Sequence, residues 1–122
     1  MDYLKAKPDG TVSVDEITQY LENNQNYSLV AVMAASNESG VIQPWRQIAQ
    51  LCKHFAVPYH CDSTQLPGKE ELDDLSLCSF NVASAHKFGG PKGIGWLIGE
   101  NATSLLVGGE QENGRRGGTE NY

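Results

Sequence analysis

The stretch SLVAVMAA at residues 28–35 decides the fold of this chain. After its leading serine the stretch is apolar throughout, and it lacks the polar alternation of a strand that faces water on one side. A short, unbroken apolar run is typical of a strand buried on both faces, as in a parallel sheet. We therefore expect residues 28–35 to form an inner strand that is covered on both sides.

Helical and extended patterns alternate around this strand. The residue pattern predicts helices over residues 15–24 and 44–55 and one or two helical turns over 70–75. It predicts further strands over residues 57–61, 79–83 and 94–98. In the second helix, Trp45 begins an apolar stripe and is most simply a core residue. Such alternation indicates an α/β fold, here a mostly parallel sheet with flanking helices.

Composition narrows the functional classes. The length of 122 residues fits one domain on a scale of about 150 residues per domain. Fifteen acidic and nine basic residues give a formal charge of −6, which argues against a general nucleic-acid binder. No stretch approaches the roughly 20 apolar residues of a membrane span, and residues 1–10 lack the pattern of a secretory signal.

The three cysteines suggest reduced thiols in a cytoplasmic protein, because their number is odd and no secretory signal precedes them. Cys52 falls on the apolar helix stripe and Cys61 falls in a strand, where thiols are usually inert packing residues. Cys78 lies near a loop and is expected to be more open. The cysteines and histidines lack the spacing of a zinc site, so we expect no metal.

Polar side chains follow three consecutive strands of the predicted sheet. In an open α/β sheet, ligands bind beyond the carboxyl ends of the strands. Each group taken alone could simply end its strand in a solvated turn, but three such ends converging on one edge favour a binding site. The candidates are Asn37 after the first strand, Asp62 and Gln65 after the second, and Ser84, His86 and Lys87 after the third.

Among these candidates, Lys87 points to the most specific chemistry. A lysine amine attacks a carbonyl only when it is deprotonated, and a partly desolvated, cation-rich setting favours that form. His86 and the glycines that follow could supply such a setting, and Ser84 with His86 could bind a phosphate. The alternative is a surface lysine beside a glycine turn.

Asp62 suits a different role. A carboxylate can pair with a protonated pyridine nitrogen and so make the ring a better electron sink. The amides of Asn37 and Gln65 can hydrogen-bond a ring oxygen. A lysine, a carboxylate, phosphate-binding groups and amides together are what pyridoxal 5'-phosphate (PLP) requires of a protein.

The sequence resembles the class V aminotransferase family, and within it the cysteine desulfurases. Four stretches in the same order carry the resemblance, and together they cover nearly all of the chain. These are residues 37–44 (NESGVIQP), 60–65 (HCDSTQ), 84–93 (SAHKFGGPKG) and 108–121 (GGEQENGRRGGTEN).

The resemblance implies a PLP-dependent transferase of fold type I and a role for each matching residue. Lys87 would hold the cofactor covalently and later move protons, and Asp62 would pair with the pyridine nitrogen. Gln65 would contact the ring hydroxyl, and Asn37 would contact the hydroxyl side and the substrate carboxylate.

The remaining implied contacts concern the phosphate. Ser84 and His86 would bind it within the subunit, and Thr119 would reach across a dimer interface to the neighbour's phosphate. The resemblance therefore implies a homodimer. It places residues 1–107 in a partial PLP-binding large domain and makes the glycine- and arginine-rich residues 108–122 a loop that is flexible or lies at the dimer interface.

The implied activity is mobilisation of sulfur from L-cysteine with release of alanine, in support of iron–sulfur cluster assembly and with a possible sulfur-acceptor protein as partner. Family members are longer and carry a glycine-threonine phosphate loop, a stacking histidine, a nucleophilic cysteine and a small domain that this sequence does not match. We therefore expect a segment that is inactive alone. The alternative function is a catalytically inactive domain that binds the cofactor or a partner.

Overall fold

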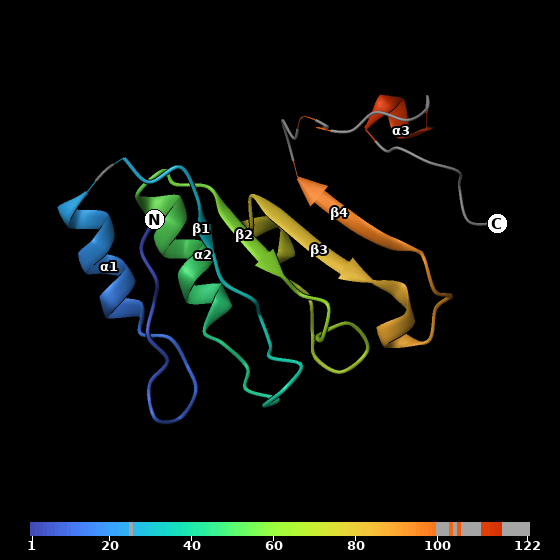
Figure 1. Cartoon of the computed structure of the whole chain (residues 1–122), viewed down its shortest axis with the longest axis horizontal. Coiled ribbons are helices and arrows are strands. Elements are labelled where there is room, and N and C mark those ends of the chain that lie inside the picture. The colour runs from blue at the N-terminus through green and yellow to red at the C-terminus, as the bar shows by residue number, and fades with distance from the viewer. Residues whose placement is uncertain (25, 100–102, 104, 106–110, 116–122) are drawn as a thin grey trace.

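The computed structural model describes residues 1–24, 26–99, 103, 105 and 111–115. The elements are α1 (Val14–Asn23), β1 (Val30–Ala31), α2 (Trp45–His54), β2 (Tyr59–Asp62), the 3-10 turn η1 (Leu75–Leu77), β3 (Phe80–Ser84), the 3-10 turn η2 (Ala85–Phe88), β4 (Gly95–Gly99) and α3 (Gln111–Gly114). Figure 1 shows a single sheet, with α1 and α2 beside its first two strands.

The sheet has four strands in the order β1-β2-β3-β4. The β1–β2 and β2–β3 pairs are parallel, and β4 returns antiparallel to β3. Hydrogen bonding of the first strand continues past β1, because Val32 N donates to His60 O at 3.2 Å and Ala34 N donates to Asp62 O at 2.8 Å. The prediction of a mostly parallel α/β sheet is confirmed.

Two helices supply most of the core against this sheet. The Ser13 hydroxyl caps α1 by accepting from Glu16 N at 3.3 Å, and the helix buries Ile17 and Leu21. In α2 the predicted apolar stripe is buried, with Trp45 only 2% exposed. The stripe also includes Ile48, Ala49 and Cys52.

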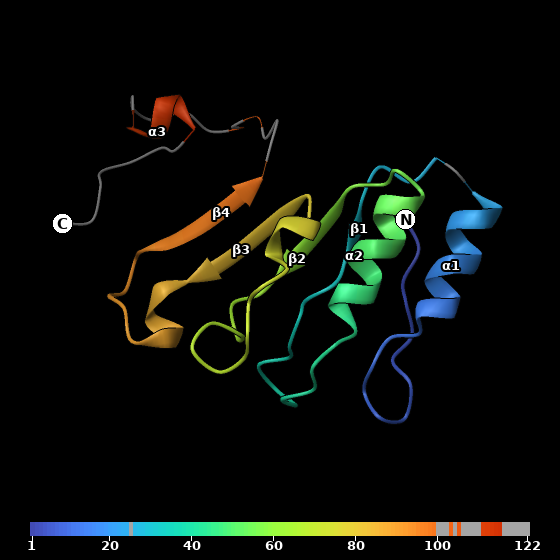
Figure 2. The ribbon, with the colours of Figure 1, turned by 180° about the vertical axis from the view of Figure 1, so that it is seen from behind.

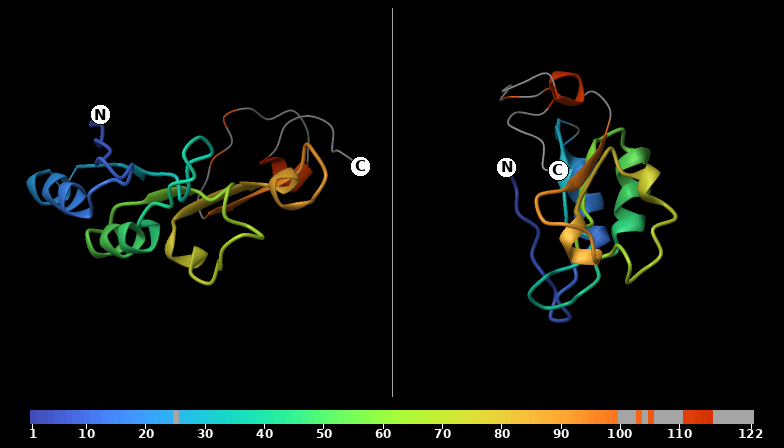
Figure 3. Two further views of the ribbon diagram at one scale, coloured as in Figure 1. Left: turned by 90° about the horizontal axis from the view of Figure 1, so that it is seen from below. Right: turned by 90° about the vertical axis from the view of Figure 1, so that its right-hand side faces the viewer.

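The predicted burial of residues 28–35 on both faces is wrong for this structure. Figure 3 shows α2 on one face of the sheet. Side chains on that covered face, such as Tyr59 and Cys61, are buried, whereas Leu29 and Met33 are 46% and 45% exposed. The apolar pattern correctly predicts a strand, but within the described residues helices cover only one side of it. We call the two sides the covered face and the open face.

Residues 70–75 were expected to be helical, but the 3-10 turn lies instead at Leu75–Leu77. The Arg46 guanidinium binds this segment, because its Nη2 donates to Glu71 O at 2.9 Å and to Asp73 Oδ1 at 2.7 Å. These contacts hold residues 71–73 against the start of α2.

Cys78 was expected to be open but is buried, because η1 turns it toward the core beneath α2. Of the carboxyl-terminal residues 108–122, the structure describes 111–115, and the others lie outside the described residues. The view from behind in Figure 2 shows the turn α3 beyond the end of β4.

Among the described residues, no helix is long and apolar enough to cross a membrane.

Candidate cofactor site

The carboxyl ends of β1, β2 and β3 lie at one edge of the sheet because these strands run in parallel. In Figure 1 the loops that follow the three strands emerge together along this edge. Asp62 ends β2 and Ser84 ends β3, and the register pairs Asp62 with Val82. The structure therefore brings the predicted candidates from three strands to the same edge.

Asp62 is held in a fixed turn. It is half-buried, and its Oδ1 accepts a hydrogen bond from Thr64 N at 2.9 Å. Its backbone carbonyl accepts from Ala34 N, which ties the turn to the neighbouring strand. Gln65 lies in the same turn and accepts from Lys69 Nζ at 3.3 Å through its Oε1. The Asp62 carboxylate thus keeps one oxygen engaged by the backbone while it remains partly open to a ligand.

Lys87 lies on η2, in the connection between β3 and β4. The base of this connection is closed by two backbone bonds, from Ala85 N to Ile94 O and from Gly90 N to Ala85 O, both 2.9 Å. Gly90 packs so closely on Ala85 that an added Cβ would lie 2.7 Å from the alanine Cβ. The side chains of Lys87 and His86 are exposed. The loop is therefore rigidly anchored, but it presents its amine and imidazole to solvent.

Asn37 is exposed in the turn that follows the first strand. The hydroxyl of Ser36 shapes this turn by accepting from Glu38 N and Ser39 N, each at 3.2 Å. Thr119, the last of the candidates, lies outside the described residues.

The three thiols belong to the buried core cluster on the covered face of the sheet. All three are buried. Burial raises the pKa of Cys52 to about 11, so that thiol stays protonated at neutral pH. The pKa of Cys78 is raised by its hydrogen bond to Cys61 and by burial. The hydrogen bond from Cys78 lowers the pKa of Cys61. Because all three side chains are buried, none offers an accessible thiolate in this structure. The described residues contain no metal-ligating cluster.

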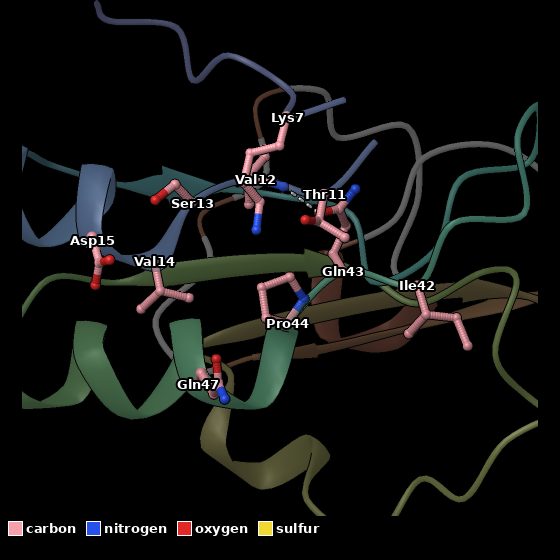
Figure 4. A pocket seen from close by; sticks show the side chains of 10 residues that line it. All are labelled: Lys7, Thr11, Val12, Ser13, Val14, Asp15, Ile42, Gln43, Pro44 and Gln47. Atoms are coloured by element: carbon pink, nitrogen blue, oxygen red, sulfur yellow. Dashed lines mark hydrogen bonds between the residues drawn. The ribbon is translucent and has the colours of Figure 1, made fainter. Parts of the chain in front are cut away.

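A polar pocket of about 420 Å³ lies between the first loop of the chain and the starts of α1 and α2. Figure 4 shows Gln43 reaching from beside Pro44 toward this loop. The Gln43 side chain accepts from Val12 N at 2.8 Å and donates to Gly10 O at 2.9 Å. Its amide fastens the amino-terminal loop to the turn region that carries Asn37.

Two buried polar residues beneath the edge, Ser63 and Asn81, were not identified as candidates from the sequence. Both are fully buried. Their partners are distant in the chain, since Ser63 bonds to Asn81 and Trp96 bonds to Asn81 across separations of 18 and 15 residues. No local pattern could have indicated this arrangement.

Comparison with protein families gives one match over most of the chain. The model of the family "Aminotransferase class-V" matches residues 1–115. A cysteine desulfurase IscS from Clostridium botulinum is 40% identical over 124 residues, which cover 98% of this chain and 30% of that relative. The mitochondrial cysteine desulfurase of Arabidopsis thaliana is 39% identical, with 96% and 27% of the two chains covered.

Solved structures agree with this match. A NifS-like protein from Rickettsia africae superposes with a TM-score of 0.87 at 32% identity, over 97% of this chain and 34% of its own. The protein SspA in complex with cysteine superposes with a TM-score of 0.84 at 32% identity, over 98% and 35%. The chain thus spans about a third of the length of the proteins that it matches.

Proposed function

Because the chain belongs to the class-V aminotransferase family, we propose that it holds PLP at the carboxyl edge of its sheet and serves a cysteine desulfurase reaction. In that reaction sulfur is removed from L-cysteine and alanine is released. The observation that carries the proposal is the convergence of a lysine, a carboxylate, a hydroxyl, an imidazole and amides from three strand ends. The similarity to a protein solved in complex with cysteine supports L-cysteine as the substrate.

The donor set at this edge fits the chemistry of the cofactor. PLP needs an amine for its aldehyde, an anion for its ring nitrogen and hydrogen-bond donors for its phosphate, and when bound it supplies an electron sink. Lys87 would hold it covalently through Nζ, with release of one water. Asp62, which the Thr64 amide keeps in place, would accept a hydrogen bond from the protonated ring nitrogen.

The other candidates would orient the ring and the phosphate. Asn37 and Gln65 would contact the ring hydroxyl, and Asn37 would also contact the substrate carboxylate. Ser84 and His86 would bind the phosphate. Thr119, in the tail, would reach the phosphate of a second subunit, so we propose a homodimer in which residues 108–122 lie at the interface.

The sulfur step needs an accessible thiolate. The thiols of Cys52, Cys61 and Cys78 are buried, so these 122 residues by themselves should release little or no sulfide from cysteine. We propose that sulfur passes to an acceptor protein in iron–sulfur cluster assembly and that the reaction takes place in the cytoplasm. Strong sulfide release that survives replacement of all three cysteines but disappears in Lys87→Ala would contradict the argument about the thiols.

A second candidate function is a domain that binds cofactor or partner without turnover. The exposed Lys87 amine favours it for the isolated chain, because the described residues leave that amine in water rather than desolvating it. The first function and a cofactor-binding domain both predict PLP capture, and only the first function predicts turnover. Sulfide release in the presence of the homologous regions of a longer relative would distinguish them.

Borohydride trapping tests the cofactor site directly. The chain is incubated with PLP, borohydride reduces the C=N bond to a stable secondary amine, and mass spectrometry locates the label. We expect label on Lys87, loss of that label in Lys87→Ala, and no change in the control Lys53→Ala, which alters an exposed lysine on α2. Equal labelling of all lysines would overturn the proposed site.

A further inference from the structure

Strand β3 carries, at its second residue, a polar side chain that the proposed reaction does not use. Asn81 is fully buried, and its side chain makes three hydrogen bonds. Its Oδ1 accepts from Ser63 Oγ at 2.9 Å and from Trp96 Nε1 at 2.9 Å, while its Nδ2 donates to Cys61 O at 3.2 Å. One amide thus joins strands β2, β3 and β4.

Ser63 connects this amide to the turn that holds Asp62. It follows Asp62 directly, and its backbone N donates to Val82 O at 3.0 Å. Its hydroxyl lies within hydrogen-bond distance of both Asn81 Oδ1 and Val82 O. The residue that begins the Asp62 turn is therefore anchored to β3 by side chain and backbone.

Trp96 connects the same amide to the loop that carries Lys87. It lies on β4, just beyond the loop, and pairs with Ala83 in the antiparallel register. Its ring packs against Phe88, with centroids 5.4 Å apart. Since Phe88 directly follows Lys87 on η2, the indole contacts the lysine loop while its N–H is held by Asn81.

The hydrogen bonds determine the orientation of the Asn81 amide. An indole N–H can only donate, and a backbone carbonyl can only accept. The oxygen must therefore face Trp96 and the nitrogen must face the Cys61 carbonyl. Neither an aspartate nor an apolar residue at this position could satisfy both neighbours, and a polar group left unpaired in the interior is costly.

We infer that Asn81 is a positioning residue, which with Ser63 and Trp96 couples the Asp62 turn to the Lys87 loop. The inference rests on the proposed function, because it assigns the network to the two groups that would hold opposite sides of PLP.

The first test does not depend on the cofactor. Trp96→Phe keeps an aromatic ring against Phe88 and removes the N–H that Asn81 accepts. Amide hydrogen exchange is then followed at Thr64, whose N–H bonds to the Asp62 carboxylate on the far side of the network. We expect exchange at this amide to become about tenfold faster in Trp96→Phe and in Asn81→Leu.

Tyr59→Phe is the matched control. It removes another buried hydrogen bond of the same sheet, from the Tyr59 hydroxyl to Val32 O at 3.0 Å. This variant should be destabilised to a similar degree, as measured by thermal unfolding, yet leave Thr64 exchange close to that of the wild type. Unchanged Thr64 exchange in Trp96→Phe, or an equal effect in Tyr59→Phe, would overturn the coupling.

The second test uses PLP trapping on the same variants. We expect the fraction of label on Lys87 to fall in Trp96→Phe and Asn81→Leu, to fall no further in the double variant, and to stay unchanged in Tyr59→Phe. Additive losses would mean that the two residues act separately and would reject the network. If the wild type itself shows no preference for Lys87, the proposed function fails, and the exchange experiment still decides whether the coupling exists.

Discussion

The covered face and the open face of the sheet have different surroundings. On the covered face, Tyr59, Cys61 and Asn81 are at most 1% exposed. On the open face, Leu97 is 60% exposed. An apolar side chain contributes to stability in proportion to the surface that it removes from water. The covered face should therefore account for most of the folding free energy, and the open face should govern association.

The largest effect should come from the covered face. Trp45→Ala removes a side chain that is 2% exposed at the start of α2 and that also stacks under Arg46, at 4.3 Å from its guanidinium carbon. Replacing a buried tryptophan by alanine typically costs about 3–5 kcal/mol. Urea unfolding should show a loss of this size. A loss below about 1 kcal/mol would mean that α2 contributes little to the core.

A smaller effect should follow from the loss of a helix cap. Ser13→Ala removes the oxygen that accepts from Glu16 N at the start of α1. Such substitutions cost about 1 kcal/mol. The same unfolding experiment should show this decrease, whereas Ser39→Ala, in the exposed turn after the first strand, should change the unfolding free energy less.

On the open face we expect a change in association rather than in stability. Leu97→Ser replaces an exposed leucine, so the unfolding free energy should change by no more than about 0.5 kcal/mol. Self-association, measured by light scattering over a dilution series, should decrease because less apolar surface is available for contact. Gln19→Ser, on the exposed side of α1, is the control. A wild type that stays monomeric at high concentration would contradict the role given to the open face.

The smallest effect concerns the ion pair between Arg46 of α2 and Asp73, and it depends on pH. The hydrogen bond from Arg46 lowers the pKa of Asp73 below its ordinary value of 3.8. A lowered pKa in the folded state stabilises the protein above the unfolded pKa, and that contribution is lost as the pH falls toward the folded value. Asp73→Asn should therefore lower stability slightly at pH 7 and have less effect near pH 3. Because both side chains are largely exposed, a strong pH dependence from this pair would be unexpected.

Local patterns were sufficient to locate the strand ends that carry Asn37, Asp62 and Lys87. An apolar run followed by a polar residue marks the end of a strand, and parallel strands end at one edge of a sheet. The resemblance then supplied a role for each residue. The same patterns did not identify Asn81, because a polar residue within a strand ordinarily indicates its solvent-facing side.

By itself, the sequence determined the order of helices and strands, the α/β class and the edge at which the candidate residues gather, since each depends on neighbours along the chain. Only the tertiary structure decided which face of the sheet is covered, that η1 buries Cys78, and that Arg46 binds the segment before Leu75. It also decided the link from Ser63 through Asn81 to Trp96. These features depend on residues that are far apart in the chain, and periodicity in a sequence carries no information about which distant side chain will become a neighbour.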